Sequence, residues 1–420
     1  MKRAVYLILV MVVTLHVTAQ EKKSLTIDDL VTWKRITERV ISDDGSVIAF
    51  KTEPSQGDPE IKLYDGNGEL KATFSYATGA AVSSDSKFFF FTIKAPDEEV
   101  RQLKLKKTKK DDMPVDKLGI YNVSTGVTDT IERLKSYKVP SKWSGWIAWQ
   151  TEPGKARPAA PADSAAGKGE KAAASAGEEK GEKPAATVVT AEEKGGKPEA
   201  TAGTGQEKGD KPKKPKSQSA DNGYTLYIRD LASGKADSVM FVTDYLFAAE
   251  AEKLMYATTG DDNGAEPGVV IIDLRKGEKT ALYTGKAKYR QLTMDKKGER
   301  AAFILSFDEK DKVGNTFSLC SWSGKGLAAV AASQGTAGIP EGWIINENSR
   351  LMFAENSPRL FFGTSPAYKI KDTTVLDEER AVVDVWHWSE GILHTAQVVR
   401  KSRDLKKTYM AVFHSDRGKV

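Results

Sequence analysis

The chain has 420 residues, 40 % of them hydrophobic, so it is long enough for two or three average domains or for one large repeat domain with a packed core. Its 63 lysine and arginine residues stand against 58 aspartate and glutamate residues, which gives a formal net charge of +5. This mixed balance is typical of a solvated surface and predicts no nucleic-acid partner.

The first residues have the layout of a secretory signal peptide. Lys2 and Arg3 form a short positive region, the stretch 4–17 is almost continuously apolar, and Ala19 is a small residue ahead of a charged segment. A membrane anchor needs about 20 consecutive apolar residues, more than this stretch contains. We therefore expect residues 1–19 to be a cleaved signal peptide and the mature protein to be exported, periplasmic or secreted. We expect no stable membrane insertion after cleavage.

A helical segment is predicted over residues 20–40. The stretch 26–29, Thr-Ile-Asp-Asp, has the form of a capping box. Apolar residues then follow at helical spacing: Leu30, Trp33, Ile36 and Val40.

From residue 41 onward, helical periodicity gives way to a repeat. The stretch 40–50, VISDDGSVIAF, has an apolar entrance, an Asp-Asp-Gly turn and an alternating run that ends in Phe50. Similar strand–turn–strand stretches follow at 81–92, 139–149, 246–257, 291–303 and 343–353, and a last, incomplete unit runs from 383 to 420. Most of them are followed by a third strand, a polar turn and a fourth strand.

Four strands in every 40 to 50 residues are the signature of a β-propeller. A β-sandwich or barrel would not need the same turn at the same place in each unit. We predict an all-β propeller over residues 41–420, with about six to eight four-stranded blades, the last one incomplete, and a short N-terminal helix.

The composition changes abruptly over residues 154–222. This segment is nearly all Ala, Gly, Lys, Glu, Pro, Ser and Thr, without aromatic residues. Such a composition buries too little apolar surface to offset ordering entropy, so we predict a disordered insert. It falls between the second and third strands of the third repeat, where a long loop interrupts one blade without dividing two domains. A tether that binds a polyanion or a surface is the functional alternative.

Motifs that carry catalytic chemistry are not found. The sequence has no Gly-x-Ser-x-Gly nucleophile elbow, HExxH, P-loop, paired CxxC or dinucleotide fingerprint. The nearest string to an elbow surrounds Ser365, but Pro366 stands where an oxyanion-hole N–H is needed. We therefore predict no catalytic, cofactor-binding or metal-binding residues and no cofactor.

Isolated reactive residues have simpler interpretations. Cys320 lies in an apolar, strand-like run and is expected to be a buried apolar residue. His387, His394 and His414 have no metal-ligand spacing, although His387 lies between two tryptophans on an expected strand and could face a substrate. The basic run 400–407 is expected to be a solvated loop.

Two stretches resemble a known family. The segment 38–45, Glu-Arg-Val-Ile-Ser-Asp-Asp-Gly, follows the expected helix with Trp33, and the segment 383–388, Val-Asp-Val-Trp-His-Trp, continues into 403–412. Together with the signal peptide they look like the N-terminal propeller of exported serine peptidases of the prolyl oligopeptidase family. The resemblance covers nearly all of the chain except the insert.

The resemblance implies a propeller that gates the access of short peptides to a C-terminal α/β-hydrolase domain with a Ser-Asp-His triad. No triad residue has a matching position in these 420 residues, so we expect this chain to be a fragment or truncated product that is inactive alone. Its implied partners are short peptides and the hydrolase domain. The alternative is a stand-alone periplasmic propeller, similar to TolB, that binds a protein or peptide.

Overall fold

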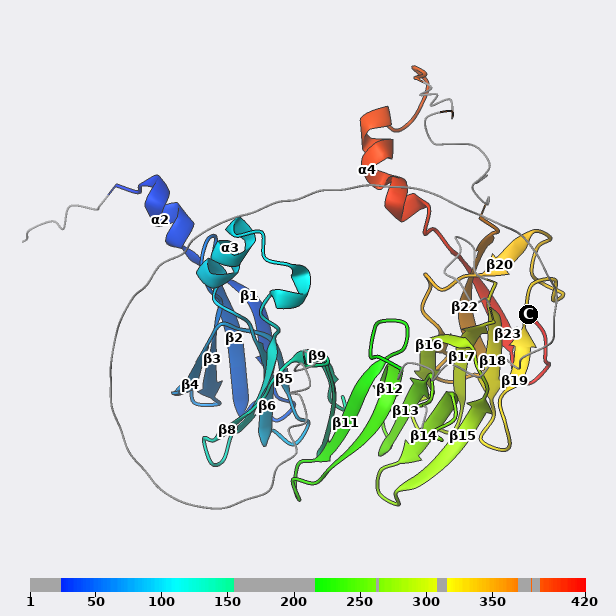
Figure 1. The fold of residues 1–420 in the computed structure, drawn as a ribbon, viewed down its shortest axis with the longest axis horizontal. Coiled ribbons are helices and arrows are strands. Elements are labelled where there is room, and N and C mark those ends of the chain that lie inside the picture. Colours follow the sequence, from blue (N-terminus) through cyan, green and yellow to red (C-terminus); the bar gives the residue numbers. More distant parts are fainter. Residues whose placement is uncertain (1–23, 155–215, 262–263, 308–315, 369–378, 380–385) are drawn as a thin grey trace, which may run out of the picture. The chain divides into compact units, whose positions relative to one another are not determined.

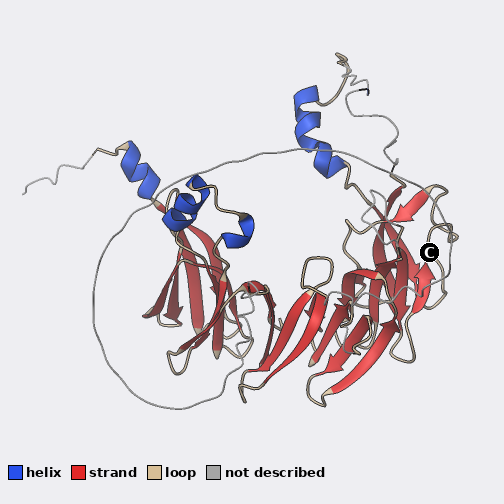
Figure 2. Ribbon diagram, in the orientation of Figure 1, coloured by secondary structure: helices blue, strands red, loops and turns tan. Residues whose placement is uncertain are grey.

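A computed structural model describes residues 24–154, 216–261, 264–307, 316–368, 379 and 386–420. The expected signal peptide, most of the predicted insert and the start of the last predicted repeat (383–385) lie outside the described residues. The described parts before Pro153 and after Lys216 belong to one compact unit. Strands are the main secondary structure of this unit, and its described helices are few and short (Figure 2).

The strands form a succession of antiparallel sheets in chain order (Figure 1). The first sheet contains β1 (Lys34–Ile41), β2 (Val47–Pro54), β3 (Glu60–Asp65) and β4 (Leu70–Ser75). The second contains β5 (Ala77–Val82), β6 (Phe88–Ile93), β7 (Lys117–Asn122) and β8 (Thr128–Ile131). A seven-stranded sheet follows, with β9 (Leu134–Lys138), β10 (Trp146–Thr151), β11 (Tyr224–Asp230), β12 (Ala236–Phe247), β13 (Lys253–Thr258), β14 (Gly268–Asp273) and β15 (Glu278–Thr284).

Two further sheets complete the described chain. The first contains β16 (Lys288–Met294), β17 (Ala301–Ser306), β18 (Ser318–Trp322) and β19 (Ala329–Ala332). In the second, β22 (Arg359–Pro366) pairs with β20 (Trp343–Ile345) and β21 (Met352–Phe353) along one edge and with β23 (Tyr409–His414) along the other.

The seven-stranded sheet is two blades that share one strand. β12 pairs with β11 up to Val242 and with β13 from Val242 onward, so its two halves close one blade and open the next. The described residues therefore form six blades in sequence, and the predicted β-propeller fold is confirmed. The first strands of neighbouring blades contact each other: β1 contacts β5, and β12 contacts β16.

The same backbone device joins blades at three junctions. Tyr76, Arg133 and Phe241 each have a left-handed φ of 57° to 60°, and each immediately precedes a buried residue of the next first strand. Their carbonyls accept the N–H of Lys94, Glu152 and Thr259, each of which directly follows a second strand. A single left-handed residue thus turns the chain from one blade into the next.

Alternating side chains of one strand fill the two spaces on either side of a blade. Phe89 and Phe91 of β6 pack in the core shared with the first blade, whereas Phe90 packs against Ile147 and Trp149 of the third. This is the period-2 alternation of a strand buried on both faces. Because the Phe91 ring would lie within 2.4 Å of any Cβ at Gly119, the neighbouring strand needs glycine there.

The turns between first and second strands follow the predicted pattern and also contact one another. In the first blade, the Ser42 hydroxyl donates to Asp44 (2.6 Å) and accepts from the Val47 N–H (2.9 Å), and Ser83, Asp85 and Phe88 repeat these bonds in the second. Ser86 of the second turn donates to Asp44 of the first (2.7 Å). Hydrogen bonds from Ser42 and then Ser86 hold the pKa of Asp44 well below its usual value.

Later turns are bonded in the same neighbour-to-neighbour manner. Lys142 of the third turn pairs with Glu250 of the fourth at 2.7 Å, and Lys296 of the fifth pairs with Glu355 of the sixth at 3.0 Å. The ends of the blades that carry these turns therefore face the same way.

The opposite ends carry the long connections and every described helix. The connections between second and third strands there include residues 94–116, 152–223 and 367–408. The helices are α2 (Ile27–Thr32), which precedes β1, α3 (Asp97–Leu105), the 3-10 turn η1 (Lys110–Asp112) and α4 (His394–Asp404). The predicted insert lies between β10 and β11, the second and third strands of the third blade, as expected.

Several sequence-based expectations are corrected. The helix predicted up to Val40 ends at Thr32, and Lys34–Ile41 is strand β1, because this β-branched stretch pairs along β2. The capping box at Thr26 is confirmed. The end of the predicted disordered insert, residues 216–222, is ordered where described, since the Lys216 ammonium donates to the carbonyls of Thr259 (2.8 Å) and Gly260 (2.7 Å).

The sixth repeat differs from its predicted form. Its stretch 343–353 is not a hairpin, because β20 and β21 lie along the same edge of β22 and the hairpin turn comes after Phe353. The last predicted unit is not a separate blade, because β23 is the next strand of this same sheet. His387 lies in a turn and not on a strand, and most of the basic run 400–407 belongs to helix α4.

Candidate binding surface on the first strands

The first strands of the blades carry a chain of polar contacts, which we call the first-strand belt: Glu38, Thr78, Tyr137, Lys138 and Asp244. It begins at Glu38 on β1, inside the segment that resembles the peptidase family. β1 has a register shift between Ile36 and Glu38, and β5 has one between Thr78 and Ala81. These irregularities free backbone N–H groups from the ladder and direct them to a side chain.

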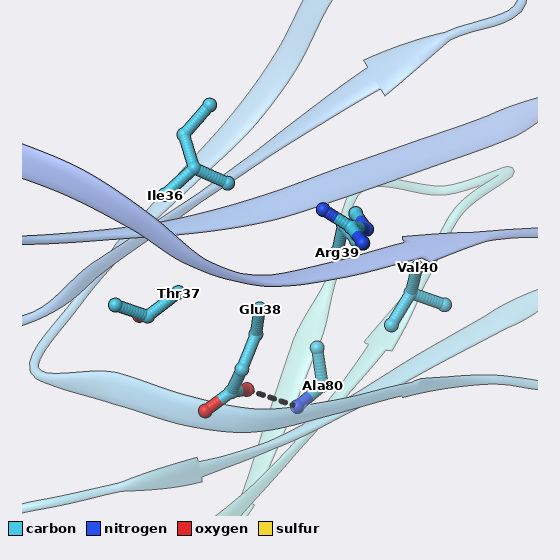
Figure 3. A pocket seen from close by; sticks show the side chains of 6 residues that line it. All are labelled: Ile36, Thr37, Glu38, Arg39, Val40 and Ala80. Carbon is cyan, nitrogen blue, oxygen red and sulfur yellow. Dashed lines mark hydrogen bonds between the residues drawn. The ribbon is translucent and has the colours of Figure 1, made fainter.

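The Glu38 carboxylate collects four donors. It accepts from the Thr78 hydroxyl (2.9 Å) and from the backbone N–H groups of Gly79 (2.8 Å) and Ala80 (3.3 Å), the last drawn in Figure 3. The Lys51 ammonium lies 2.8 Å from the same carboxylate and 3.3 Å from Glu53. Glu38 thus joins the first blade to the second.

The charge states of Glu38 and Lys51 follow from these contacts. Burial alone would raise the pKa of Glu38, but hydrogen bonds from Lys51, Thr78 and Ala80 outweigh it and lower the pKa. Burial would lower the pKa of Lys51, but its contacts with Glu38 and Glu53 raise it. Both groups are held in their charged forms at neutral pH.

The belt continues across the next two junctions. The Tyr137 hydroxyl of β9 donates to the Gly79 carbonyl of β5. The Lys138 ammonium donates to the Tyr245 carbonyl, lies 3.4 Å from Asp244, and stands 4.8 Å from the centre of the Tyr245 ring. Burial, with the nearby charge of Glu38, raises the pKa of Tyr137, so this phenol stays protonated and acts as a donor.

An open cavity of about 410 Å³ adjoins Glu38 (Figure 3). Its lining residues come from β1 and β5: Ile36, Thr37, Glu38, Arg39, Val40 and Ala80. Because Glu38 is already bonded by Lys51 and two N–H groups, the exposed Arg39 is the charged side chain most available to a ligand. The arrangement can bind a polar or anionic group, and it contains no paired nucleophile and base.

The structure places the residues considered from the sequence apart from this belt. Cys320 of β18 is fully buried, and burial raises the pKa of its thiol to about 12, as expected for an unreactive residue. Ser365 is buried on β22 and accepts a hydrogen bond from Asn346 (2.8 Å), so it occupies a strand and not an elbow. His387 contacts the Ser389 hydroxyl at 2.6 Å.

The sequence contained one overlooked signal for this surface. Along β2, Val47, Ala49 and Lys51 share one buried face, so a lysine stands where the alternation calls for an apolar residue. A buried lysine requires an anionic partner, and Glu38 supplies it.

In the described residues no group of three or more His, Cys, Asp or Glu side chains could hold a metal ion. No described helix is long and apolar enough to span a membrane.

Comparisons with known proteins give structural matches only. No protein-family model matches the chain, and no curated protein is detectably similar to it. The acylaminoacyl peptidase of Pyrococcus horikoshii is 8 % identical, with a TM-score of 0.36, over 79 % of this chain and 43 % of that one. The chain therefore spans less than half the length of that peptidase.

Two further solved structures are similar to the chain. The β-propeller domain of the Trilobed protease from Pyrococcus furiosus is 11 % identical, with a TM-score of 0.34, over 80 % of this chain and 86 % of that one. TolB from Acinetobacter baumannii is 12 % identical, with a TM-score of 0.29, over 69 % of this chain and 53 % of that one. Likenesses at this level concern the fold and carry no information on activity or ligand.

Proposed function

We propose that this chain is the propeller region of an exported serine peptidase of the prolyl oligopeptidase family. In this role the propeller limits the access of short peptides to an α/β-hydrolase domain and performs no chemistry itself. The observation that carries the proposal is the family-like segment 38–45. Its residues build the first blade, supply the Glu38 link to the second blade and form the turn that bonds to Ser86.

The arrangement of loops supports a gating role. All described helices and the long connections project from one end of the blades, whereas the other end has only short turns. A partner domain that covers the first end would leave a passage along the first strands, lined by the polar belt. Short peptides would then contact the uncharged Tyr137 phenol and the exposed, positively charged Arg39.

Export is part of the proposal and has a separate test. The layout of residues 1–19 supports cleavage after Ala19, so the mature protein should begin at Gln20. N-terminal sequencing of protein recovered from the envelope fraction of the source cells tests this expectation. A mature protein that retains Met1 in the cytoplasm would contradict it.

A tagged native protein tests the peptidase role. An epitope inserted between residues 155 and 215 at the native locus, followed by affinity purification and fluorophosphonate labelling, should yield a labelled serine hydrolase domain that travels with the tag. The 420-residue chain produced alone should remain unlabelled and should not cleave prolyl or aminoacyl nitroanilides. Tagged protein without any labelled hydrolase, bound instead to another envelope protein, would favour the stand-alone, TolB-like alternative.

A further inference from the structure

Residues 386–407, which we call the aromatic–basic arm, expose several large apolar side chains. Trp388 is 92 % exposed, Val399 81 %, Leu393 76 % and Trp386 66 %. Helix α4, at the centre of the arm, buries none of its residues. Exposed tryptophans gathered with aliphatic residues mark an interaction surface, because contiguous apolar patches are uncommon on soluble monomers, whereas single exposed apolar residues are normal.

The arm has a defined local structure. The Trp386 ring packs on His394 with ring centres 4.4 Å apart, and the Gln397 amide donates to Glu390 (2.7 Å) and to the Ile392 carbonyl (2.9 Å). The turn 386–393 is thus folded back onto the first residues of α4. The tryptophans therefore belong to the same surface as the helix.

The charge of the arm indicates the kind of surface that it binds. Arg400 and Arg403 are three residues apart and share one side of α4, a helix that also contains Lys401; Lys406 and Lys407 follow the end of the helix at Asp404. Among the ion pairs of the described residues, these cations have only the contact of Arg403 with its neighbour Asp404, at 3.8 Å. Val398 and Leu405, seven residues apart, share a different side of the helix.

We infer that the aromatic–basic arm binds the surface of a membrane containing anionic phospholipids, as a peripheral contact without insertion of a spanning helix. Basic amphipathic helices with tryptophan on or beside the apolar side lie in the headgroup region of bilayers, where lysine and arginine attract phosphates. Tryptophan and arginine are common at protein–protein interfaces too, but lysine is depleted there, so Lys401, Lys406 and Lys407 favour a lipid over a protein surface. The inference does not require the peptidase role, and a hydrolase domain at this end of the blades would have to leave the arm uncovered.

Vesicle binding tests the inference on the chain from Gln20 to Val420, since residues 1–19 would bind lipid themselves. The chain should sediment with phosphatidylglycerol–phosphatidylcholine vesicles and not with pure phosphatidylcholine, and added salt should release it because exposed charges are screened. Either Trp386→Ser with Trp388→Ser or Arg400→Glu with Arg403→Glu should weaken binding at least about ten-fold. Tryptophan fluorescence should shift to the blue on binding, and the tryptophan variant should lose that shift.

Matched controls lie at the far end of the blades. Lys276→Glu with Lys279→Glu reverses two exposed cations near the β14–β15 turn, and Leu327→Ser removes an exposed aliphatic residue; neither should alter binding. Because α4 buries nothing, the arm variants should keep the circular dichroism of the parent. Absence of binding to anionic vesicles, or binding unchanged in both arm variants, would overturn the inference. Loss of an envelope protein partner in the arm variants, with vesicle binding unchanged, would equally overturn it.

Discussion

Glu38 shows how one side chain can set the contact between two blades. Its carboxylate bonds two backbone N–H groups that the bulge in β5 leaves outside the ladder, and it also neutralises Lys51. Removing it would take this acceptor from four donors at once, the Thr78 hydroxyl included. A hydrogen-bonded charge of this kind contributes more than an ordinary surface ion pair.

We expect Glu38→Ala to lower the free energy of unfolding by about 2 kcal/mol, because the Gly79 and Ala80 N–H groups and Lys51 lose their acceptor. Urea unfolding followed by fluorescence measures the change. Glu53→Ala is the control, since Glu53 is a more exposed second partner of Lys51. Among the described contacts, Glu53 accepts no hydrogen bond from the backbone of the second blade. Equal losses in the two variants would refute the linking role of Glu38.

The same residue predicts a pH dependence. The pKa of Glu38 is lowered in the folded state, so its stabilising contribution is fully present above the unfolded value near 4.5 and is lost as the pH falls through the lower folded value. The stability difference between the parent and Glu38→Gln should therefore shrink on acidification below about pH 4.5. A difference that stays constant down to about pH 3 would contradict this assignment.

Two glycines test how closely the backbone constrains single positions. Gly45, with φ of 71°, has open space where a Cβ would stand, so Gly45→Ala should cost only the left-handed penalty of about 1 kcal/mol. Gly223, with φ of 89°, would place a Cβ 2.5 Å from the Phe241 backbone, so Gly223→Ala should cost about 3 kcal/mol. Thermal unfolding of the two variants compares them, and an equal cost would count against the tight approach at Gly223.

At the scale of elements, the turn pattern could be predicted because its chemistry is local. Ser42, Asp44 and Gly45 bond within five residues, and the same grammar recurs in later blades. The end of the first helix, expected at Val40, could not be predicted from local sequence chemistry. The stretch 34–41 has apolar spacing compatible with a helix, and only its pairing with β2, a tertiary contact, makes it a strand.

The sixth blade also shows that local sequence patterns do not settle which residues form strands. Asn346 and Asn348 resemble residues of a hairpin turn, but their side chains form hydrogen bonds with each other and with Tyr368. Pairing along this edge of β22 therefore stops after Ile345 and begins again at Met352. The Glu38 contact was equally hidden, because it depends on bulges in two different strands. Local patterns thus predicted the fold, whereas the site depended on contacts between blades.

Helix α3 offers a test at this scale. Lys107, just after the helix, has a left-handed φ of 53°. The Thr108 N–H donates to the Leu103 carbonyl, and the Lys107 N–H donates to the Lys104 carbonyl. These two hydrogen bonds form a Schellman motif at the C-terminal end of α3. Lys107→Gly should stabilise this end by about 0.5 to 1 kcal/mol, because glycine adopts the conformation without strain. Hydrogen exchange of the α3 amides should slow. Lys106→Gly, at an ordinary φ, should accelerate it instead.

At the scale of the whole molecule, two apolar sheet faces are left partly uncovered. Ile41, Ile48, Tyr64 and Leu70 stand opposite one another in a row across β1 to β4, and Ile41 and Leu70 are 64 % and 49 % exposed. Met352, Phe361 and Val412 form a similar row in the last sheet. These two rows lie on the first and last sheets of the described chain, whereas the blades between them share a buried core with a neighbour on each side.

We expect the chain from Gln20 to Val420, produced alone, to self-associate through these faces at micromolar concentrations, because unlike surfaces that fit each other join copies head to tail. Ile41→Lys with Leu70→Lys should restore a monomer in size-exclusion chromatography with light scattering. Leu327→Lys, an exposed aliphatic residue elsewhere, should not. A parent chain that stays monomeric at all concentrations would contradict the expectation.

The bonds between neighbouring turns bear on how such a protein can change in evolution. A residue added to the turn at Asp44 or Glu250 would pull its partner, Ser86 or Lys142, out of reach. Lengthening is therefore penalised at that end and tolerated at the other, where residues 94–116, 152–223 and 367–408 already differ greatly in size. Related proteins should vary in the length of these connections while their short turns keep constant length, and foreign sequences grafted into this protein should be accepted at the same three places.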